Sequence, residues 1–202
     1  MRVVELVKQV VQTEAEALSK LVDQIDESFA EAIEIIQKCQ GKVVVTGVGK
    51  SGIVGKKIVA SLSSTGTPAF FVHACEAVHG DSGMIEERDV VVMISNSGET
   101  REVLDVVPVL DQIGCKRIAI TSNHESTLAK LSDVSLAYNY EKEADHLNLA
   151  PTTSTTLTMV IGDALAVALS ILKEFSEEDF HRYHPGGSLG AKLSDLQNKG
   201  DR

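Results

Sequence analysis

The segment from Val43 to Gly52, VVVTGVGKSG, decides the fold. It opens on the β-branched run Val43–Thr46, which is typical of a short strand buried on both faces. The glycines that follow let the backbone turn tightly, and the apolar spacing of Ile53–Ser63 predicts a helix directly after them. The segment therefore predicts a strand, a glycine-rich turn and a helix in immediate succession.

The same succession repeats along the sequence. The further predicted strands are Ala69–Val72, Val90–Ile94, Arg117–Thr121 and Val134–Ala137, and the later helices are Arg101–Ile113 and Ser126–Leu131. Parallel neighbours need crossover connections, so this alternation predicts an α/β fold. We expect a three-layer α-β-α sandwich with a five-stranded parallel sheet in the order 2-1-3-4-5.

Long helices are predicted on either side of these units. Apolar residues recur at three- and four-residue steps from Val3 to about Cys39, which predicts one long helix or two consecutive ones. Thr153–Lys173 carries its apolar residues on one stripe and predicts a helix that closes the core. We expect a single domain over residues 1–202, with N-terminal helices in 1–40 and the α/β core and a C-terminal segment in 41–196.

Composition limits the class of protein. The chain is 43% hydrophobic and 24% charged, which is typical of a soluble globular domain. A formal net charge of −10 disfavours binding to a nucleic acid backbone. No apolar run approaches the ~20 residues that cross a bilayer, and the N-terminus does not have the pattern of a signal peptide. We expect a cytoplasmic protein without a nucleic acid or membrane partner, with its three scattered cysteines reduced.

A second loop suited to anions follows the third predicted strand. The segment Ser95–Thr100, SNSGET, offers three hydroxyls before a predicted helix, where free amides and the helix dipole favour negative charge. A simple N-cap by Ser97 or Thr100 is the alternative, but capping needs one hydroxyl. In a sheet of this order, ligands bind where the strand order reverses, between strands one and three. Gly49–Gly52 and Ser95–Thr100 follow these two strands, so together they predict one phosphate site.

Four other motifs accompany Ser95–Thr100, and with it they resemble the SIS (sugar isomerase) domain family, closest to its arabinose-5-phosphate isomerases. They are GVGKSG at 47–52, EAVHGD at 76–81, APTTSTT at 150–156 and HPGGSLG at 184–190. The usual members carry two regulatory CBS domains after the last helix, whereas this sequence ends at Arg202, so the resemblance is to stand-alone forms. Ser82 stands where the family pattern leads us to expect leucine.

The resemblance implies an aldose–ketose isomerase that interconverts ribulose 5-phosphate and arabinose 5-phosphate through an enediol(ate). It implies that the phosphate is held by Ser51, Ser95, Asn96, Ser97 and Thr100, and that the rest of the substrate contacts Gly49, Thr152, Thr153 and Ser154. Such a reaction moves a proton between C1 and C2 and requires no redox cofactor. We also expect no metal, because the sequence offers no compact group of metal ligands.

The candidates for the chemistry itself are Lys50, His79, Glu102, Glu143 and His184. Lys50, beside the phosphate loop, would stabilise oxyanion charge, because a helix start disfavours a merely solvated lysine. His79 either shuttles protons or bonds the loop backbone, and Glu102 competes with Glu99 for the role of base. Glu143 would ordinarily be a solvated surface charge, and only the family resemblance singles it out. His184 precedes a Pro-Gly-Gly turn and is the preferred C1/C2 base.

His184 lies outside the predicted sheet core, so we expect it to complete a neighbour's site. The resemblance implies a homotetramer built from dimers. Two other functions stay open at this point. One is isomerisation of another sugar phosphate, and the other is non-catalytic phosphosugar sensing, since SIS domains also occur in transcription regulators. The absence of a basic helix-turn-helix segment from the sequence disfavours the regulator.

Overall fold

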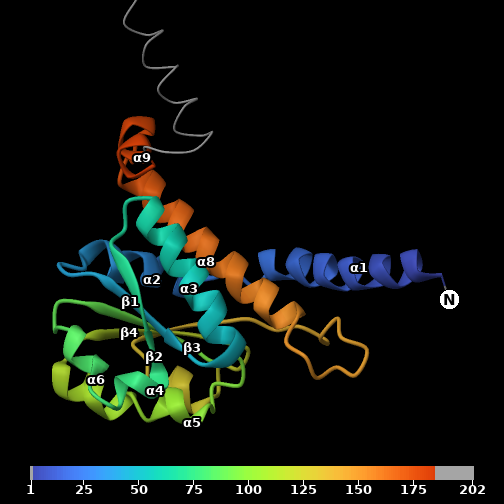
Figure 1. Cartoon of the computed structure of the whole chain (residues 1–202), viewed down its shortest axis with the longest axis horizontal. Coiled ribbons are helices and arrows are strands. Elements are labelled where there is room, and N and C mark those ends of the chain that lie inside the picture. Colours follow the sequence, from blue (N-terminus) through green and yellow to red (C-terminus); the bar gives the residue numbers. More distant parts are fainter. Residues whose placement is uncertain (1, 185–202) are drawn as a thin grey trace, which may run out of the picture.

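The computed structural model describes residues 2–184 and contains the predicted sheet. Five parallel strands lie in the order β2-β1-β3-β4-β5, which confirms the predicted order (Figure 1). In chain order the elements are α1 (Val3–Val22), α2 (Glu27–Lys38), β1 (Val43–Gly47), α3 (Gly49–Ser64), β2 (Ala69–His73), α4 (Ala74–Ala77), the 3₁₀ helix η1 (Asp81–Met84), β3 (Val90–Ile94), α5 (Arg101–Leu104), α6 (Val107–Ile113), β4 (Lys116–Thr121), α7 (Thr127–Lys130), β5 (Val134–Ala137), α8 (Thr153–Leu172) and α9 (Glu177–Tyr183).

Two helical layers cover the sheet, and the alternation of side chains along each strand decides which layer a residue meets. On β1, Val43 and Val45 pack in the cluster that includes α1, α2, α3 and α8. Val44 points the other way and packs in the cluster that includes α4, α5 and α6. Every residue of β1 and β3 is buried, as expected for strands covered on both faces. The predicted three-layer sandwich is therefore confirmed (Figure 1).

Two predicted helical segments are divided. The N-terminal one becomes α1 and α2, and Asp26 starts α2 by accepting a hydrogen bond from the Ser28 amide at 3.0 Å. The predicted helix Arg101–Ile113 becomes α5 and α6. Pro108 has no N–H to donate to the carbonyl of Leu104, so α5 ends and α6 begins with the proline in its first turn.

α8 corrects one expectation from the sequence. By length and apolar composition its 20 residues could cross a membrane, although we expected no run of that kind. In the fold, Leu157, Ile161 and Leu165 are buried in the core beside the sheet. A Cβ at Gly162 would overlap Ile58, so α8 and α3 cross at close range. Packing as a core helix accounts for the buried apolar residues of α8, whereas Val167, Ile171 and Leu172 near its end are exposed.

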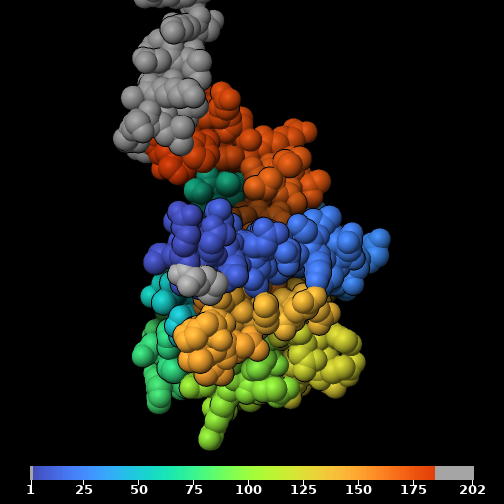
Figure 2. All heavy atoms as spheres, turned by 90° about the vertical axis from the view of Figure 1, so that its right-hand side faces the viewer, coloured from blue at the N-terminus to red at the C-terminus, as the bar shows by residue number. Residues whose placement is uncertain are grey.

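α1 projects beyond the sheet (Figure 1). Its C-terminal half packs on the core through Ala17 and Leu21, whereas Val3 and Val7 near its start are 75% and 59% exposed. Figure 2 faces the tip of this helix and shows the segment that precedes α8 beneath it. A groove of about 940 Å³ lies between α1 and residues 142–146. The described residues therefore leave an apolar surface of α1 exposed.

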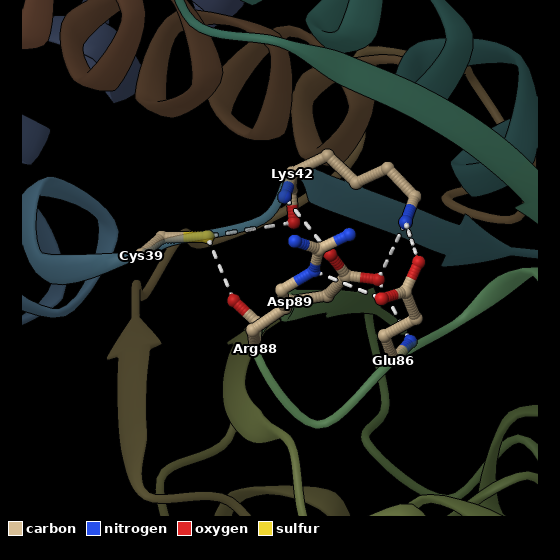
Figure 3. Close-up of polar contacts among 5 residues, drawn as sticks. All are labelled: Cys39, Lys42, Glu86, Arg88 and Asp89. Carbon is tan, nitrogen blue, oxygen red and sulfur yellow. Dashed lines mark hydrogen bonds and ion pairs between the residues drawn. The ribbon is translucent and has the colours of Figure 1, made fainter.

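A buried carboxylate joins β1 to β3 at the edge of the sheet where these strands begin (Figure 3). The Asp89 side chain is 0% exposed. Its Oδ1 accepts from the Lys42 amide at 2.9 Å, and its Oδ2 accepts from Lys42 Nζ and the Glu86 amide, both at 2.8 Å. Burial raises the pKa of Asp89, but the hydrogen bonds from Lys42 and Glu86 outweigh it and hold the pKa below its usual value.

We expect Asp89→Ala to lower the free energy of unfolding by about 2–4 kcal/mol, because it leaves three donors without their acceptor. The control Lys42→Met removes the cation but leaves both amide donors to the buried carboxylate, so we expect it to cost less than Asp89→Ala. The depressed pKa means that the stabilisation is present at neutral pH and is lost below about pH 4, as pH falls through the folded pKa. Urea unfolding at pH 7 and pH 3 measures this. If Asp89→Ala lowered the free energy of unfolding equally at pH 7 and pH 3, the ionised form of Asp89 would not be the source of the stabilisation.

Candidate active site

The two loops rich in glycine and serine leave the sheet side by side. β1 and β3 are neighbours, and their parallel register places Gly47 opposite Ile94. The loop after Gly47 and the loop that begins at Ser95 therefore start together, at the point where the strand order reverses. The predicted meeting of the two loops is confirmed.

The first loop presents open backbone at this corner. α3 starts at Gly49, whose φ of +55° lies in the left-handed region, and a Cβ built there meets no atom within 4 Å. Lys50 is exposed and Ser51 is half-buried on the first helical turn. The unpaired amides of this turn form the positive end of a 16-residue helix. An anion therefore has both space and favourable potential here.

The second loop is held in shape by its own hydroxyls. Ser95 Oγ lies 2.7 Å from Thr100 Oγ1 and accepts from the Gly98 amide at 3.0 Å. Ser97 is exposed, and its Oγ accepts from the Glu99 amide at 3.1 Å. The Ser97 hydroxyl acts as acceptor in this contact, so its own proton can be donated to a ligand. Of the predicted phosphate contacts in this loop, Ser97 is the best placed to donate outwards.

Glu99, the rival base, makes a contact that fixes the fold. Its Oε1 accepts from the Thr127 amide at 2.7 Å, at the start of α7. Hydrogen bonds from Thr127, aided by the charge of Lys130, hold the pKa of Glu99 below its usual value. Glu102 is exposed on the first turn of α5. Glu99 is therefore engaged in holding the start of α7, and the choice between Glu99 and Glu102 as the base stays a prediction.

Glu143 is not the solvated surface charge that its acidic segment suggests, because it is only 6% exposed. Its Oε2 accepts from the amides of Thr152 at 2.8 Å and Ser154 at 3.1 Å, at the start of α8. Its Oε1 accepts from Tyr140 Oη at 2.9 Å. Burial raises the pKa of Glu143, but hydrogen bonds from Ser154, Thr152 and Tyr140 outweigh it and hold the pKa low. The carboxylate orients the turn that carries the predicted substrate contacts Thr152, Thr153 and Ser154.

Asn96 is turned inward. Its Oδ1 accepts from Tyr138 Oη at 2.9 Å, and its Nδ2 donates to Tyr140 Oη at 3.0 Å. Tyr138 is 1% exposed, and its buried hydroxyl needs a partner. Both polar atoms of the Asn96 side chain are thus bonded within the protein, and its predicted phosphate contact stays a prediction. Sequence reasoning missed both tyrosines, and their only signal is their place just after a predicted strand.

Lys50 and His79 lie at the same edge of the sheet as the two loops. Lys50 is the second residue of α3, which follows β1. His79 is exposed in the turn after α4, which follows β2, and β2 pairs with β1. Within residues 2–184 no three His, Cys, Asp or Glu side chains are grouped as metal ligands.

His184 lies at the other end of α8. Its ring stacks on Phe180 with 4.0 Å between centroids, and its Nδ1 lies 2.9 Å from the Phe180 carbonyl oxygen. α8 begins beside the candidate site at Thr153 and runs for 20 residues, about 30 Å (Figure 1). At its far end Lys173 donates to the loop that leads into β2. One chain therefore does not bring His184 to its own phosphate loops. Residues 185–190 of this motif lie outside the described residues.

Comparison with known proteins identifies relatives along most of the sequence. The chain is 54% identical over 197 residues to the arabinose 5-phosphate isomerase KdsD of Yersinia pestis. It is 51% identical over 188 residues to the arabinose 5-phosphate isomerase KpsF of Escherichia coli O6:H1, strain CFT073. These alignments cover 96% and 93% of this chain but 60% and 58% of the relatives, so the chain spans less than two thirds of their length.

A solved structure agrees with this relationship. The structure of the E. coli CFT073 protein c3406 in complex with arabinose 5-phosphate matches with a TM-score of 0.89 and 49% identity, covering 91% of this chain and 97% of that one. The profile of the SIS domain matches residues 35–168, which is more than half of the sequence. The chain therefore belongs to the SIS domain family.

Proposed function

We propose that this chain is an aldose–ketose isomerase that interconverts ribulose 5-phosphate and arabinose 5-phosphate. The observation that carries the proposal is the meeting of Gly49–Gly52 and Ser95–Thr100 at one corner of the sheet. The relatives support this substrate, since two of them above 50% identity are arabinose 5-phosphate isomerases and a matching structure holds arabinose 5-phosphate.

Local donors bind the phosphate. A net charge of −10 repels an anion at long range, so affinity has to come from contacts. The first amides of α3 and the Ser51 hydroxyl donate from one side, and the Ser97 hydroxyl donates from the other. Ser95 and Thr100 keep the second loop in shape through their mutual hydrogen bond.

The reaction moves one proton between carbons and one between oxygens. A base removes a proton from C1 of the ketose, and the electron pair forms an enediolate whose charge lies on O2. A proton then adds to C2, O1 loses its proton to leave the aldehyde, and O2 is protonated. His184 of a second copy serves the carbons and Glu102 moves the oxygen proton, while Lys50 stabilises the enediolate charge. All bond changes are internal, so neither a redox cofactor nor a metal is required.

The sugar hydroxyls lie between the phosphate loops and α8. Thr152, Thr153 and Ser154 contact them from the first turn of this helix, and Gly49 lets the substrate approach the backbone on the other side. His79 orients a hydroxyl from the turn after α4. Glu143 contributes by holding the α8 turn in place.

Assembly completes the site. About 30 Å of α8 separates His184 from the phosphate loops of its own chain, so the histidine acts in a neighbouring subunit. The exposed valines of α1 offer an apolar surface for this contact, and we expect a homotetramer built from dimers. The protein acts in the cytoplasm on a phosphorylated sugar, with neither a nucleic acid nor a membrane as partner.

Incubation of the purified protein with ribulose 5-phosphate in D₂O tests the proposal. We expect arabinose 5-phosphate with solvent deuterium at C2, followed by NMR, without added cofactor. A Lys50→Met variant prepared in the same way controls for a contaminating isomerase. Saturable binding without turnover would contradict the enzyme and favour a sensor. Turnover of a different five- or six-carbon sugar phosphate in a substrate panel would replace the proposed substrate.

A further inference from the structure

A series of partly buried hydrogen bonds, which we call the hydrogen-bond chain, runs from the phosphate loop to α8. Glu143 is an ionised acceptor, so Tyr140 must donate to it and can only accept from Asn96 Nδ2. The Asn96 side chain therefore turns its Oδ1 to Tyr138, which donates at 2.9 Å. Each donor along Tyr138, Asn96, Tyr140 and Glu143 points the same way, so the bonds polarise one another.

Both ends of this chain are anchored in the fold. The carbonyl oxygen of Asn96 accepts from the Ser122 amide at 2.8 Å and from Ser122 Oγ at 2.7 Å, which fixes the loop to the end of β4. Glu143 binds the first amides of α8 at the other end. Tyr138 also reaches α8 directly, since its Oη lies 3.0 Å from Thr158 Oγ1. The chain therefore joins two elements that are far apart in the sequence.

We propose that Tyr138, Asn96, Tyr140 and Glu143 form a positioning chain that sets the spacing between the loop Ser95–Thr100 and the first turn of α8. This inference rests on the proposed function, in which the loop holds the phosphate and α8 holds the sugar hydroxyls. The spacing must match the length of sugar between the phosphate and the reacting carbons. A misplacement of about 1 Å can cost about 10²-fold in rate, so the chain determines which sugar phosphates react well.

Tyr140→Phe tests the hydrogen-bond chain in the full-length protein, because it removes the hydroxyl that links Asn96 to Glu143 and keeps the ring. We expect kcat to fall by about 10–100-fold. We expect KM and the inhibition constant of inorganic phosphate to change by less than about threefold, since the bonds within the phosphate loop remain. The ionised Glu143 carboxylate loses the hydrogen bond from Tyr140, which raises its pKa. If protonation of Glu143 causes the fall of kcat at low pH, this fall moves to higher pH. A purely structural role would lower the melting temperature and leave kcat and its pH profile unchanged.

Further variants separate the effect of the hydrogen-bond chain from that of its surroundings. Glu141→Gln, at the next position, breaks only the exposed ion pair with Lys20 and should leave kcat unchanged. Asn96→Asp places Tyr140 Oη between two carboxylates, Asp at position 96 and Glu143, but Tyr140 has only one proton to donate. We therefore expect kcat to fall at least as much as in Tyr140→Phe. If Asn96→Ala and Tyr140→Phe act through one chain, their double variant loses much less than the product of the single losses. Fully multiplicative losses would overturn the proposal.

Amide hydrogen exchange without substrate tests the chain independently of turnover. In Tyr140→Phe we expect the amides of Gly98 and Ser154 to exchange faster together, by about tenfold or more. Faster exchange at Ser154 alone overturns the positioning chain. If both amides exchange faster in Tyr140→Phe but the protein does not convert ribulose 5-phosphate, the result supports the positioning chain and overturns only the proposed function.

Discussion

We expect His184→Ala to lower kcat by about 10³-fold, because a positioned acid–base group contributes about 10²–10⁴-fold to proton transfer. Affinity for arabinose 5-phosphate should stay within about tenfold, since the ring acts mainly in the transition state. Steady-state kinetics and calorimetry measure the two quantities. Arg182→Ala is the control, because the Arg182 side chain is 64% exposed on α9, the helix that ends just before His184. An unchanged kcat in His184→Ala rejects the histidine as the base.

A mixing experiment locates the site that His184 serves. A Lys50→Ala chain and a His184→Ala chain are each inactive alone. If His184 reaches a neighbour, a mixed dimer has one site with both intact residues, and random pairing restores about a quarter of wild-type activity. If one chain supplied both residues, every site in the mixture would lack one of them. Mixtures without recovered activity would therefore contradict the shared site.

The second large effect is expected at Gly98. Its φ of +70° strains any residue with a side chain, and an added Cβ would overlap Ser126 and lie 2.9 Å from Thr121 Oγ1. We expect Gly98→Ala to destabilise the fold by about 2–5 kcal/mol, from left-handed strain and overpacking together. The loop must also shift and displace Ser97, so affinity for the sugar phosphate should fall more than tenfold, about 1.4 kcal/mol or more. Urea unfolding and calorimetry measure these changes.

Gly114→Ala separates strain from overlap. Gly114 has a φ of +81°, and its added Cβ would come no closer than 3.7 Å to Glu87 Cγ, so only the strain of about 1–2 kcal/mol is expected. In Gly98→Ala, the second change Ser126→Gly removes the overlapping atoms at a cost of about 1 kcal/mol or less for the lost cap of α7. Partial recovery of binding in this double variant is expected. Wild-type affinity in Gly98→Ala alone would show that the loop shape does not matter.

The sequence was informative wherever the structure is local or repeats. The runs around Val43–Thr46 and Val90–Ile94 are strands buried on both faces, and the predicted strand order brings their two loops together. Pro108 also carried a readable signal, since a proline cannot continue a helix, yet the segment around it was predicted as one helix. The phosphate corner could be foreseen because the topology of a parallel sheet fixes it.

The remainder depends on contacts between distant segments. Nothing near Glu143 in the sequence shows that it is buried, because its partner amides at Thr152 and Ser154 approach only when the loop folds back on α8. The inward turn of Asn96 likewise requires Tyr138, 42 residues away. The predicted roles of Lys50, His79 and Glu102 stay predictions, and the structure shows their place at the edge of the sheet.

If His184 serves a neighbouring subunit, the length of α8 makes the proposed enzyme sensitive to dilution. A subunit released from its neighbours keeps both phosphate loops but loses the His184 that a neighbour supplied. Its own His184 cannot replace it, because about 30 Å of α8 separates that residue from the phosphate loops. Ligand capture would then persist at protein concentrations where conversion has ceased. Specific activity would thus report how many subunits are associated.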